Sequence, residues 1–414
     1  MIVLEAKLKG KAVQFKALDE ALRTAQFIRN SCLRYWMENI GVSRNDLYKY
    51  CKILADNPDF PWAKKLNSQA RQAHAERAWS AIARFFDNCK KQVPGKKGYP
   101  KFKKHQTRAS VEYKLTGWNL SSDRKYITFT DKFGAGRFKM MGTRDLNFYQ
   151  IEQINRVRVV RRSDGYYAQF LINVERTVER EPTKRTVGLD MGLNHFYTDS
   201  DGNTVENPRY LQKAQKRLKR VQRRASKKVK GSKNRRKAVN RLGRAHLKVQ
   251  RQRQDFAVKA ARCVVRSNDL VVLEDLQICN LVSQRGGRVP RLEATGEPVR
   301  VKNHHLAKSI HDAAWGDFRR WVEYFGKVYG VVTVAVAPQY TSQNCSNCGE
   351  TVKKSLSTRT HICPHCGYVQ DRDHNAAINI LKKGLNTVGH TGIKAWGEND
   401  LYLNQVTGSD KLAR

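Results

Sequence analysis

Two cysteine pairs constrain the fold of this chain more strongly than any other feature. Cys345-x2-Cys348 and Cys363-x2-Cys366 are separated by 14 residues. This spacing is typical of a structural zinc site, because each pair presents two thiolates to one tetrahedral ion. A redox pair is the weaker alternative. The sequence therefore predicts a closed site of four sulfurs that binds one structural Zn²⁺ and takes no part in catalysis.

The chain is also strongly basic. It has 414 residues, with 79 Lys and Arg against 37 Asp and Glu, and a formal net charge of +42 at pH 7. A compact body with this charge repels itself unless a polyanion neutralises it, which argues against an ordinary metabolic enzyme. Nucleic acid fits best, because closely spaced phosphates reward many Lys and Arg contacts at once. An anionic membrane surface is the competing partner.

The membrane alternative is weak, because no segment approaches the ~18 apolar residues that a spanning helix needs. Residues 1–20 carry several charges and lack the apolar centre of a signal peptide. We therefore expect a cytoplasmic protein without a membrane partner. In that reducing compartment the five cysteines outside the two pairs are expected to be core or surface thiols. They are Cys32, Cys51, Cys89, Cys263 and Cys279.

Lys and Arg are concentrated in two segments. Residues 211–253 contain 19 of them and no acidic residue. A solvated helical face is the ordinary interpretation of a charge run, but so many like charges without a counterion favour contact with nucleic acid. The second segment is the run PGKKGYPKFKKH, which begins at Pro94. The candidate contacts are Lys97, Lys101, Lys103, Lys104, Lys216, Arg217, Arg220, Arg223, Arg224, Arg235 and Arg236.

Hydrophobic periodicity separates a β and helical first part from an α/β second part. Residues 1–17 alternate as one or two strands, residues 18–93 have a helical period, and short alternating strands follow in a barrel-like sheet domain. From residue 183 onward, apolar strands alternate with helices, which is typical of an α/β domain. We expect one continuous strand at Thr186–Thr198 and one continuous helix at residues 304–328.

Three acidic residues lie where these strands end or a helix begins. Asp190 lies in the apolar segment VGLDMGLNHF, Glu274 ends a strand in LVVLEDLQ, and Asp373 lies in DRDHNAAINIL, with Asp371 in reserve. Each has an ordinary interpretation, as a satisfied buried acid, an exposed acid or a helix cap. As a set without histidine, they suit Mg²⁺ or Mn²⁺. Two such ions about 3.5–4 Å apart promote phosphodiester hydrolysis.

These segments, in this order and with the cysteine insert TSQNCSNCG…HICPHCG between them, resemble the RuvC-type nuclease of transposon-encoded TnpB proteins. TnpB proteins are compact relatives of type V CRISPR effectors. The PGKKGYPKFK run is similar to a motif that precedes the nuclease in that family. The resemblance covers roughly residues 1–385.

The resemblance implies a multi-domain fold. It consists of an RNase H-like (RuvC) α/β nuclease with a four-cysteine zinc-ribbon insert, and a β-barrel-like wedge domain that carries an inserted helical recognition lobe. The expected segments are 1–17 (first wedge strands), 18–93 (helical lobe), 94–182 (wedge), 183–340 (nuclease, with a basic helical part at 207–265), 341–370 (zinc insert), 371–390 (last nuclease segment) and 391–414 (disordered tail).

The resemblance also implies an activity, namely RNA-guided cleavage of double-stranded DNA. A guide RNA from a transposon end would pair with one DNA strand, and the protein would read a short adjacent motif. Asp190, Glu274 and Asp373 match the family's three nuclease positions and would bind Mg²⁺ (two ions, or Mn²⁺). The expected protein is prokaryotic, associated with the nucleoid when bound, and monomeric.

Three alternatives remain open at this point. A nuclease-inactive guided repressor would bind DNA without cutting it, an accessory DNA-binding protein of transposition would carry no RNA, and a zinc-knuckle RNA-binding protein would have no enzymatic role. The retention of all three acidic residues argues against the repressor. Acidic residues inside apolar strands argue against the simple RNA-binding protein.

Overall fold

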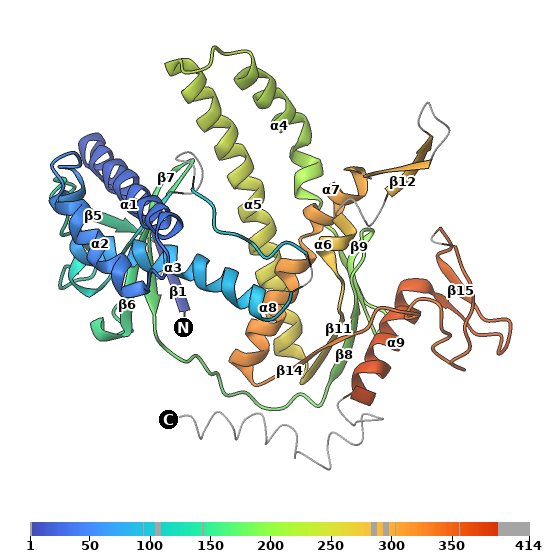
Figure 1. The fold of residues 1–414 in the computed structure, drawn as a ribbon. Coiled ribbons are helices and arrows are strands. Elements are labelled where there is room, and N and C mark those ends of the chain that lie inside the picture. The colour runs from blue at the N-terminus through green and yellow to red at the C-terminus, as the bar shows by residue number, and fades with distance from the viewer. Residues whose placement is uncertain are drawn as a thin grey trace. The chain divides into compact units, whose positions relative to one another are not determined.

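The chain divides into two compact units, Met1–Glu175 and Arg176–Arg414. Figure 1 shows a computed structural model, which describes residues 2–387 except 94, 104–108, 143–144, 283–287, 293–297, 303 and 356. Lys104 and the expected tail at 391–414 lie outside the described residues. No helix in the described ranges is long and apolar enough to cross a membrane.

The first unit contains a seven-stranded sheet in the order β2-β6-β7-β1-β5-β4-β3, with antiparallel pairing throughout. Because β1 lies between β7 and β5, the opening strand completes a sheet whose other strands follow much later in the sequence. The strands are β1 (Ile2–Lys9), β2 (Ser110–Tyr113), β3 (Trp118–Leu120), β4 (Tyr126–Phe129), β5 (Arg137–Met141), β6 (Ile154–Arg162) and β7 (Gly165–Ile172).

Helices between β1 and β2 form the rest of this unit: α1 (Ala12–Glu38), α2 (Arg44–Asp56) and α3 (Ser68–Lys90). The expectation of strands up to residue 17 was wrong, because α1 already begins at Ala12. Ala17, Leu18 and Ala21 are buried at helical spacing, and the Gln14 side chain accepts the Lys11 backbone N–H at 2.8 Å. The apparent alternation of two apolar residues was too short to distinguish strand from helix.

The second unit contains a five-stranded sheet in the order β10-β9-β8-β11-β14. β8, β11 and β14 run parallel, whereas β8, β9 and β10 are antiparallel. The single strand expected at Thr186–Thr198 was wrong, since β8 ends at Asp190 and the chain turns back into β9. Buried hydrophobic residues occur in both strands and between them, so hydrophobicity did not reveal the turn. The strands are β8 (Thr186–Asp190), β9 (His195–Asp199), β10 (Thr204–Glu206), β11 (Leu270–Glu274) and β14 (Val332–Val336).

The described helices of the second unit are α4 (Tyr210–Ser226), α5 (Lys233–Ser267), α6 (Ile278–Val282), α7 (His304–Ala313), α8 (Trp315–Tyr329) and α9 (Arg372–Thr387). The single helix expected at residues 304–328 is broken at Ala314, whose φ of 59° is left-handed. Two short hairpins complete the unit: β12 (Arg288–Leu292) with β13 (Pro298–Lys302), and β15 (Thr360–Ile362) with β16 (Val369–Asp371).

Both faces of the second sheet are covered, which explains the continuous apolar sequence of β11. Val271 and Leu273 join a core cluster with residues of α5 and α8, whereas Leu270 and Val272 join a separate cluster with α9. In Figure 1, α5 and α8 accordingly lie on one side of the β8–β11–β14 strands and α9 lies on the other. This arrangement brings the beginning of α9 to the sheet.

Glycines allow α9 to lie very close to the strands. A Cβ atom on Gly188 of β8 would overlap the Ala377 carbonyl oxygen and would lie 2.6 Å from the Leu381 backbone nitrogen. A Cβ atom on Gly384 of α9 would similarly lie 2.6 Å from a Val272 methyl carbon. Larger residues at either position would therefore push the helix from the sheet.

We expect Gly188→Ala to destabilise the α9–β8 contact by about 1–3 kcal/mol, the usual cost of overpacking. Hydrogen exchange measured on β8 and α9 peptides should show faster opening of both elements. Gly142→Ala is the matched control, because its Cβ would meet no atom closer than 3.8 Å. Unchanged exchange in Gly188→Ala would contradict the close approach.

Candidate active site and metal centre

Three of the predicted acidic residues gather where parallel strands end. Leu189 of β8 pairs with Leu273 of β11, so the next residues of these parallel strands, Asp190 and Glu274, lie at the same edge of the sheet. Asp373 lies in the first turn of α9, which packs on β8, β11 and β14. The topology therefore brings together residues that are up to 183 positions apart in the sequence.

The electrostatic environment of Asp190 is dominated by burial and by its acidic neighbours. Burial raises the pKa of Asp190 well above its usual range, and the negative charges of Glu274 and Asp373 raise it further. The positive charge of Arg372 opposes this effect only in part. A buried carboxylate that repels two others has an unfavourable energy unless a proton or a cation is bound nearby.

Glu274 is held in place by a residue that sequence reasoning missed. Its side chain is buried, and Oε1 accepts a hydrogen bond of 2.6 Å from Thr341 Oγ1. Burial raises the pKa of Glu274, whereas the Thr341 hydrogen bond and the Lys383 ammonium lower it. Thr341 lies at the start of the cysteine insert, and no spacing in the sequence linked it to β11.

Asp371, the reserve metal ligand, caps α9 with one of its two oxygens. Its Oδ1 accepts the backbone N–H groups of Asp373 at 2.9 Å and of His374 at 3.1 Å. These bonds satisfy donors that the first turn of α9 leaves unpaired. The Asp373 carboxylate is partly exposed and lies 3.5 Å from Arg359 Nη1.

The three carboxylates lie in one region of the structure, but their oxygen atoms do not form a compact cluster. Among the described residues, the only group of three or more candidate ligands with all ligating atoms within 4.8 Å of one another is the cysteine cluster. The chemistry of Asp190, Glu274 and Asp373 nevertheless fits Mg²⁺ or Mn²⁺. All three donors are hard oxygens, and their mutual repulsion is what a divalent cation relieves.

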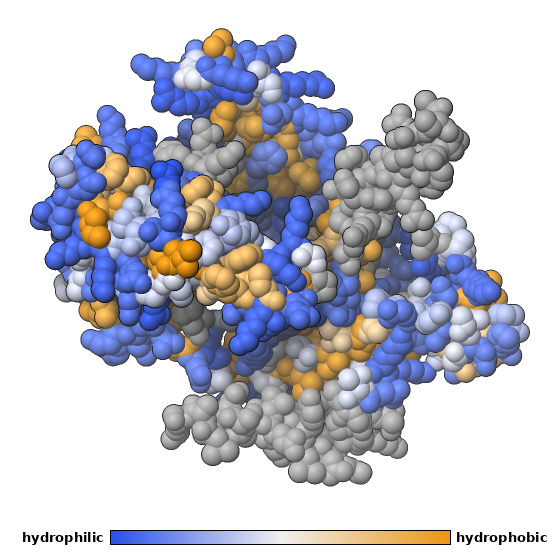
Figure 2. Space-filling model, in the orientation of Figure 1, coloured by the Kyte–Doolittle hydropathy of each residue, from blue (hydrophilic) through white to orange (hydrophobic). Residues whose placement is uncertain are grey.

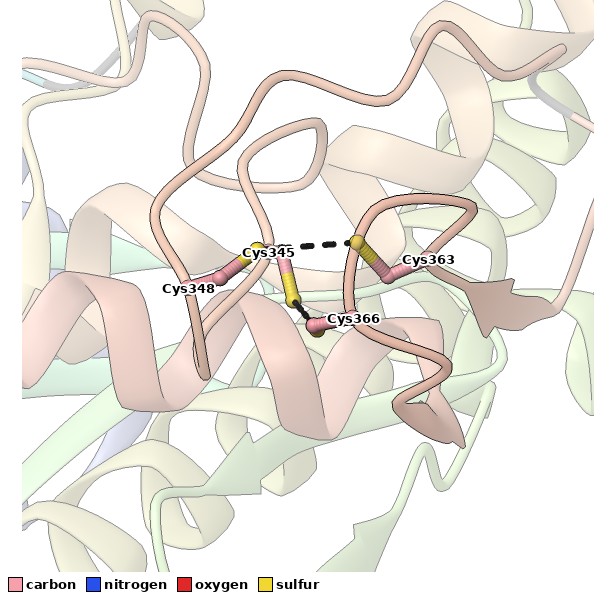
Figure 3. Close-up of side chains that lie close together, drawn as sticks. All are labelled: Cys345, Cys348, Cys363 and Cys366. Carbon is pink, nitrogen blue, oxygen red and sulfur yellow. Dashed lines mark hydrogen bonds between the residues drawn. The ribbon is translucent and has the colours of Figure 1, made fainter.

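The predicted cysteines meet as expected (Figure 3). Cys345 Sγ lies 3.7 Å from Cys366 Sγ, and Cys348 Sγ lies 3.6 Å from Cys363 Sγ. Both distances are too long for a disulfide, whose sulfurs are about 2.05 Å apart. They match the edge of a tetrahedron with metal–sulfur bonds of about 2.3 Å, so the group fits Zn²⁺.

Two asparagines connect this cluster to α9. Asn375 is fully buried; its Oδ1 accepts the Ser346 N–H at 2.9 Å, and its Nδ2 donates to the Asn344 carbonyl at 2.9 Å. Asn379 Nδ2 donates to the Asn344 carbonyl at 2.7 Å and to the Thr341 carbonyl at 2.9 Å. Sequence reasoning missed both residues, although two amides four positions apart on the otherwise apolar buried face of a helix are a detectable signal.

The basic tract of the second unit forms two helices. α4 packs against α5 through Leu218, Val221 and Ala225, which leaves its cations on the outside. Figure 2 colours the far end of this helix pair mostly hydrophilic on the face in view. Six cations line one surface hollow: Lys216, Lys219, Arg220, Arg223, Arg224 and Lys227.

The remaining residues that the sequence predicted to contact nucleic acid lie in different surroundings. Arg235 Nη1 donates to the Lys228 carbonyl at 2.8 Å and thereby braces the turn between α4 and α5. Lys97 Nζ donates to the Val93 carbonyl at 2.5 Å. Arg217 and Arg236 lie on α4 and α5, and Lys101 and Lys103 lie in the extended segment before β2.

Comparisons with known proteins show what the chain is similar to. The family described as "Probable transposase" matches residues 169–285, and the family described as "Cas12f1-like, TNB domain" matches residues 315–380. The protein named "Putative RNA-guided DNA endonuclease InsQ" of Escherichia coli (strain K12) is 32% identical over 325 residues, which are 78% of this chain and 76% of that protein.

A second relative, named "Putative RNA-guided DNA endonuclease", comes from Streptomyces pristinaespiralis. It is 32% identical over 74% of this chain and 69% of its own length. Among solved structures, a Cas12f1–sgRNA–target DNA complex has a TM-score of 0.52 at 14% identity, over 88% of this chain and 82% of that one. This likeness concerns the fold, which is of the multi-domain, RuvC type.

We expect Cys363→Ser to lose bound zinc and to loosen the 345–366 loop, because metal binding stabilises small sulfur sites. Elemental analysis of the purified protein and hydrogen exchange of the loop and α9 would measure both effects. Cys263→Ser, which changes an exposed thiol outside the cluster, should keep its zinc. Equal zinc content in the two variants would contradict the assignment.

We expect Asp190→Asn to raise the melting temperature of the metal-free protein at neutral pH, because it removes a buried negative charge from beside two others. Mg²⁺ should stabilise the native chain but not the variant, since binding stabilises only the state that binds. Asp255→Asn, which alters an exposed ion pair with Lys259, is the control. Identical responses of the native chain and Asp190→Asn to Mg²⁺ would count against the site.

Proposed function

The chain belongs to the TnpB family, and from that premise we propose that it is an RNA-guided DNA endonuclease. The observation that carries the proposal is that Asp190 and Glu274 end neighbouring parallel strands at one edge of the sheet, while Asp373 lies in the first turn of the helix that packs on those strands. Three carboxylates gathered at one sheet edge, with Glu274 buried among them, are costly to keep, so the group requires a function that uses its charge. Hydrolysis of a phosphodiester bond is such a function.

In this proposal Asp190, Glu274 and Asp373 hold Mg²⁺ against the scissile phosphate. When bound, the metal supplies an activated water and stabilises the leaving oxygen. The chain's own residues set the geometry. Thr341 holds one Glu274 oxygen through the 2.6 Å hydrogen bond, which would leave the other oxygen available as a metal ligand, and Asp371 fixes the start of the helix that carries Asp373.

In the same proposal, the 345–366 loop with its zinc supports the candidate active site. Asn375 and Asn379 join the loop to α9, and Thr341 joins its start to Glu274. The loop therefore contacts elements that carry two of the three carboxylates. Zinc bound by four sulfurs leaves no open coordination position, so its contribution would be positional.

The nucleic-acid partners follow from charge and from the family. The exposed cations of α4 are placed to contact phosphates, which provides affinity without choice of sequence. Sequence choice would come from pairing between a guide RNA, transcribed from a transposon end, and one strand of double-stranded DNA. The protein itself would read a short motif beside the target, acting as a monomer.

We expect Glu274→Ala to abolish cleavage while the neighbouring Asp275→Ala leaves it nearly unchanged. Asp275 is the matched control, because its carboxylate is exposed and pairs with Arg319. Loss of a metal ligand should reduce the rate by more than about 100-fold, since even an outer partner is worth about 10–100-fold. The assay measures cutting of duplex DNA in Mg²⁺ by the protein loaded with the RNA that copurifies with it.

Thr341→Val should fall between these two variants, with a loss of about 10–100-fold, because it removes only the hydrogen bond that orients Glu274. DNA binding measured in parallel distinguishes a failed cut from a failed complex. A native protein that binds RNA and DNA but never cuts would replace the endonuclease with a guided repressor. A native protein that carries no RNA would overturn the guided function.

A further inference from the structure

A second group of cations belongs to the first unit, whereas the candidate active site and α4 belong to the second. Arg29 is on α1, Arg77 is on α3, Arg158 is on β6, and Lys103 is in the extended segment that precedes β2. The chain thus brings four positive charges from four separate elements to one place, and such convergence requires a physical reason.

Hydrogen bonds fix these elements to one another. Asn30, next to Arg29, pairs with the backbone of Lys103 in both directions: Asn30 Nδ2 donates to the Lys103 carbonyl, and the Lys103 N–H donates to Asn30 Oδ1, each at 3.0 Å. Arg77 Nη1 donates to Ser110 Oγ of β2 at 3.0 Å. The segment with Lys103 is therefore held on α1, and α3 is held on β2.

The local acidic residue does not balance this charge. Glu112 is buried, and both of its oxygens are already used: Arg158 donates to Oε2 at 2.8 and 3.0 Å, and a neighbouring arginine of β6 donates to Oε1 at 2.8 Å. Among the ion pairs of the described residues, none joins a carboxylate to Arg29, Arg77 or Lys103. The group therefore has a net positive charge.

Partial loss of contact with water makes this excess charge unfavourable. It lowers the pKa of Lys103, although that side chain stays exposed, and the charges of Arg77, Arg29 and Arg158 lower the pKa further. Burial also lowers the pKa values of Arg29 and Arg77. Arginines remain charged in proteins in spite of such shifts, so the repulsion persists at neutral pH.

Buried donors without acceptors accompany the charges. Arg29 is only 6% exposed, and its Nε has no partner among the described residues. His74 is 2% exposed; its Nε2 accepts the Glu112 N–H at 3.3 Å, so its proton lies on Nδ1, which also lacks an acceptor within the described chain. Buried polar atoms normally have partners, and leaving them unpaired costs about 1–3 kcal/mol each.

We propose that Arg29, Arg77, Lys103 and Arg158 form a binding site for a backbone phosphate of a nucleic acid. A phosphodiester carries negative charge and accepts hydrogen bonds without donating them, which complements a site made of donors. Guanidinium groups suit phosphate geometry, and the exposed Lys103 side chain, together with the Arg158 Nη1 group that does not bond Glu112, provides the approach from solvent. This proposal depends on the proposed function in one respect only, namely that the protein binds nucleic acid.

The salt dependence of binding tests this site directly. Each phosphate contact contributes about 0.9 to the slope of log affinity against log salt for duplex DNA and about 0.7 for a single strand. The full chain, without Mg²⁺ so that nothing is cut, is titrated with a synthetic duplex DNA and separately with a synthetic single-stranded RNA. We expect Arg77→Gln to weaken binding of one of the two probes. For that probe, the slope should fall by about the value of one phosphate contact.

Two further variants keep the test decisive. Lys103→Gln changes an exposed side chain, so it should fold even if Arg77→Gln does not, and it should reduce the same slope. Lys16→Gln removes an equal charge from an exposed position on α1 outside the group and should leave both slopes unchanged. The probe whose slope falls identifies DNA or RNA as the source of the phosphate.

The opposite result is equally clear. Unchanged slopes in folded Arg77→Gln and Lys103→Gln, or an equal fall in Lys16→Gln, would overturn the phosphate site. Because the measurement needs no cleavage, that result would leave the proposed endonuclease intact. Conversely, loss of cutting in Glu274→Ala with normal slopes would concern the active site alone.

Discussion

The contact between α9 and the central strands determines the chemistry available to the second unit. Gly188 and Gly384 remove the side-chain atoms that would separate helix and sheet, so the helix backbone lies directly on β8 and β11. This brings Asp373 to the edge where Asp190 and Glu274 end their strands. If the helix lay farther from the sheet, Asp373 would no longer lie near Asp190 and Glu274.

Bringing three carboxylates together opposes folding, and the surrounding structure shows how that cost is contained. Burial and like charge raise the pKa of Asp190, while Arg372 acts in the opposite direction from the start of α9. Thr341 and Lys383 stabilise the ionised form of Glu274. These interactions offset the repulsion between the carboxylates only in part. The negative charge that remains favours the binding of cations.

Much of this could be predicted from the sequence, because the signals were local. The cysteine spacing predicted the sulfur cluster, and the endings of apolar segments indicated Asp190 and Glu274. The sequence did not reveal the turn between β8 and β9 or the break at Ala314, since buried strands and amphipathic helices continue the same hydrophobic pattern across such breaks. Thr341 escaped prediction because its role depends on a loop closing onto a distant strand.

The position of the sulfur cluster beside the carboxylates has a chemical logic. The four cysteines and Asp373 lie within 30 positions of one another in the sequence, from Cys345 to Asp373. Thiolates suit zinc and carboxylate oxygens suit magnesium, so the two groups differ in the metal that they favour. The sulfur cluster can therefore brace α9 through Asn375 and Asn379 by means of a ligand set unlike the oxygen donors of the carboxylates.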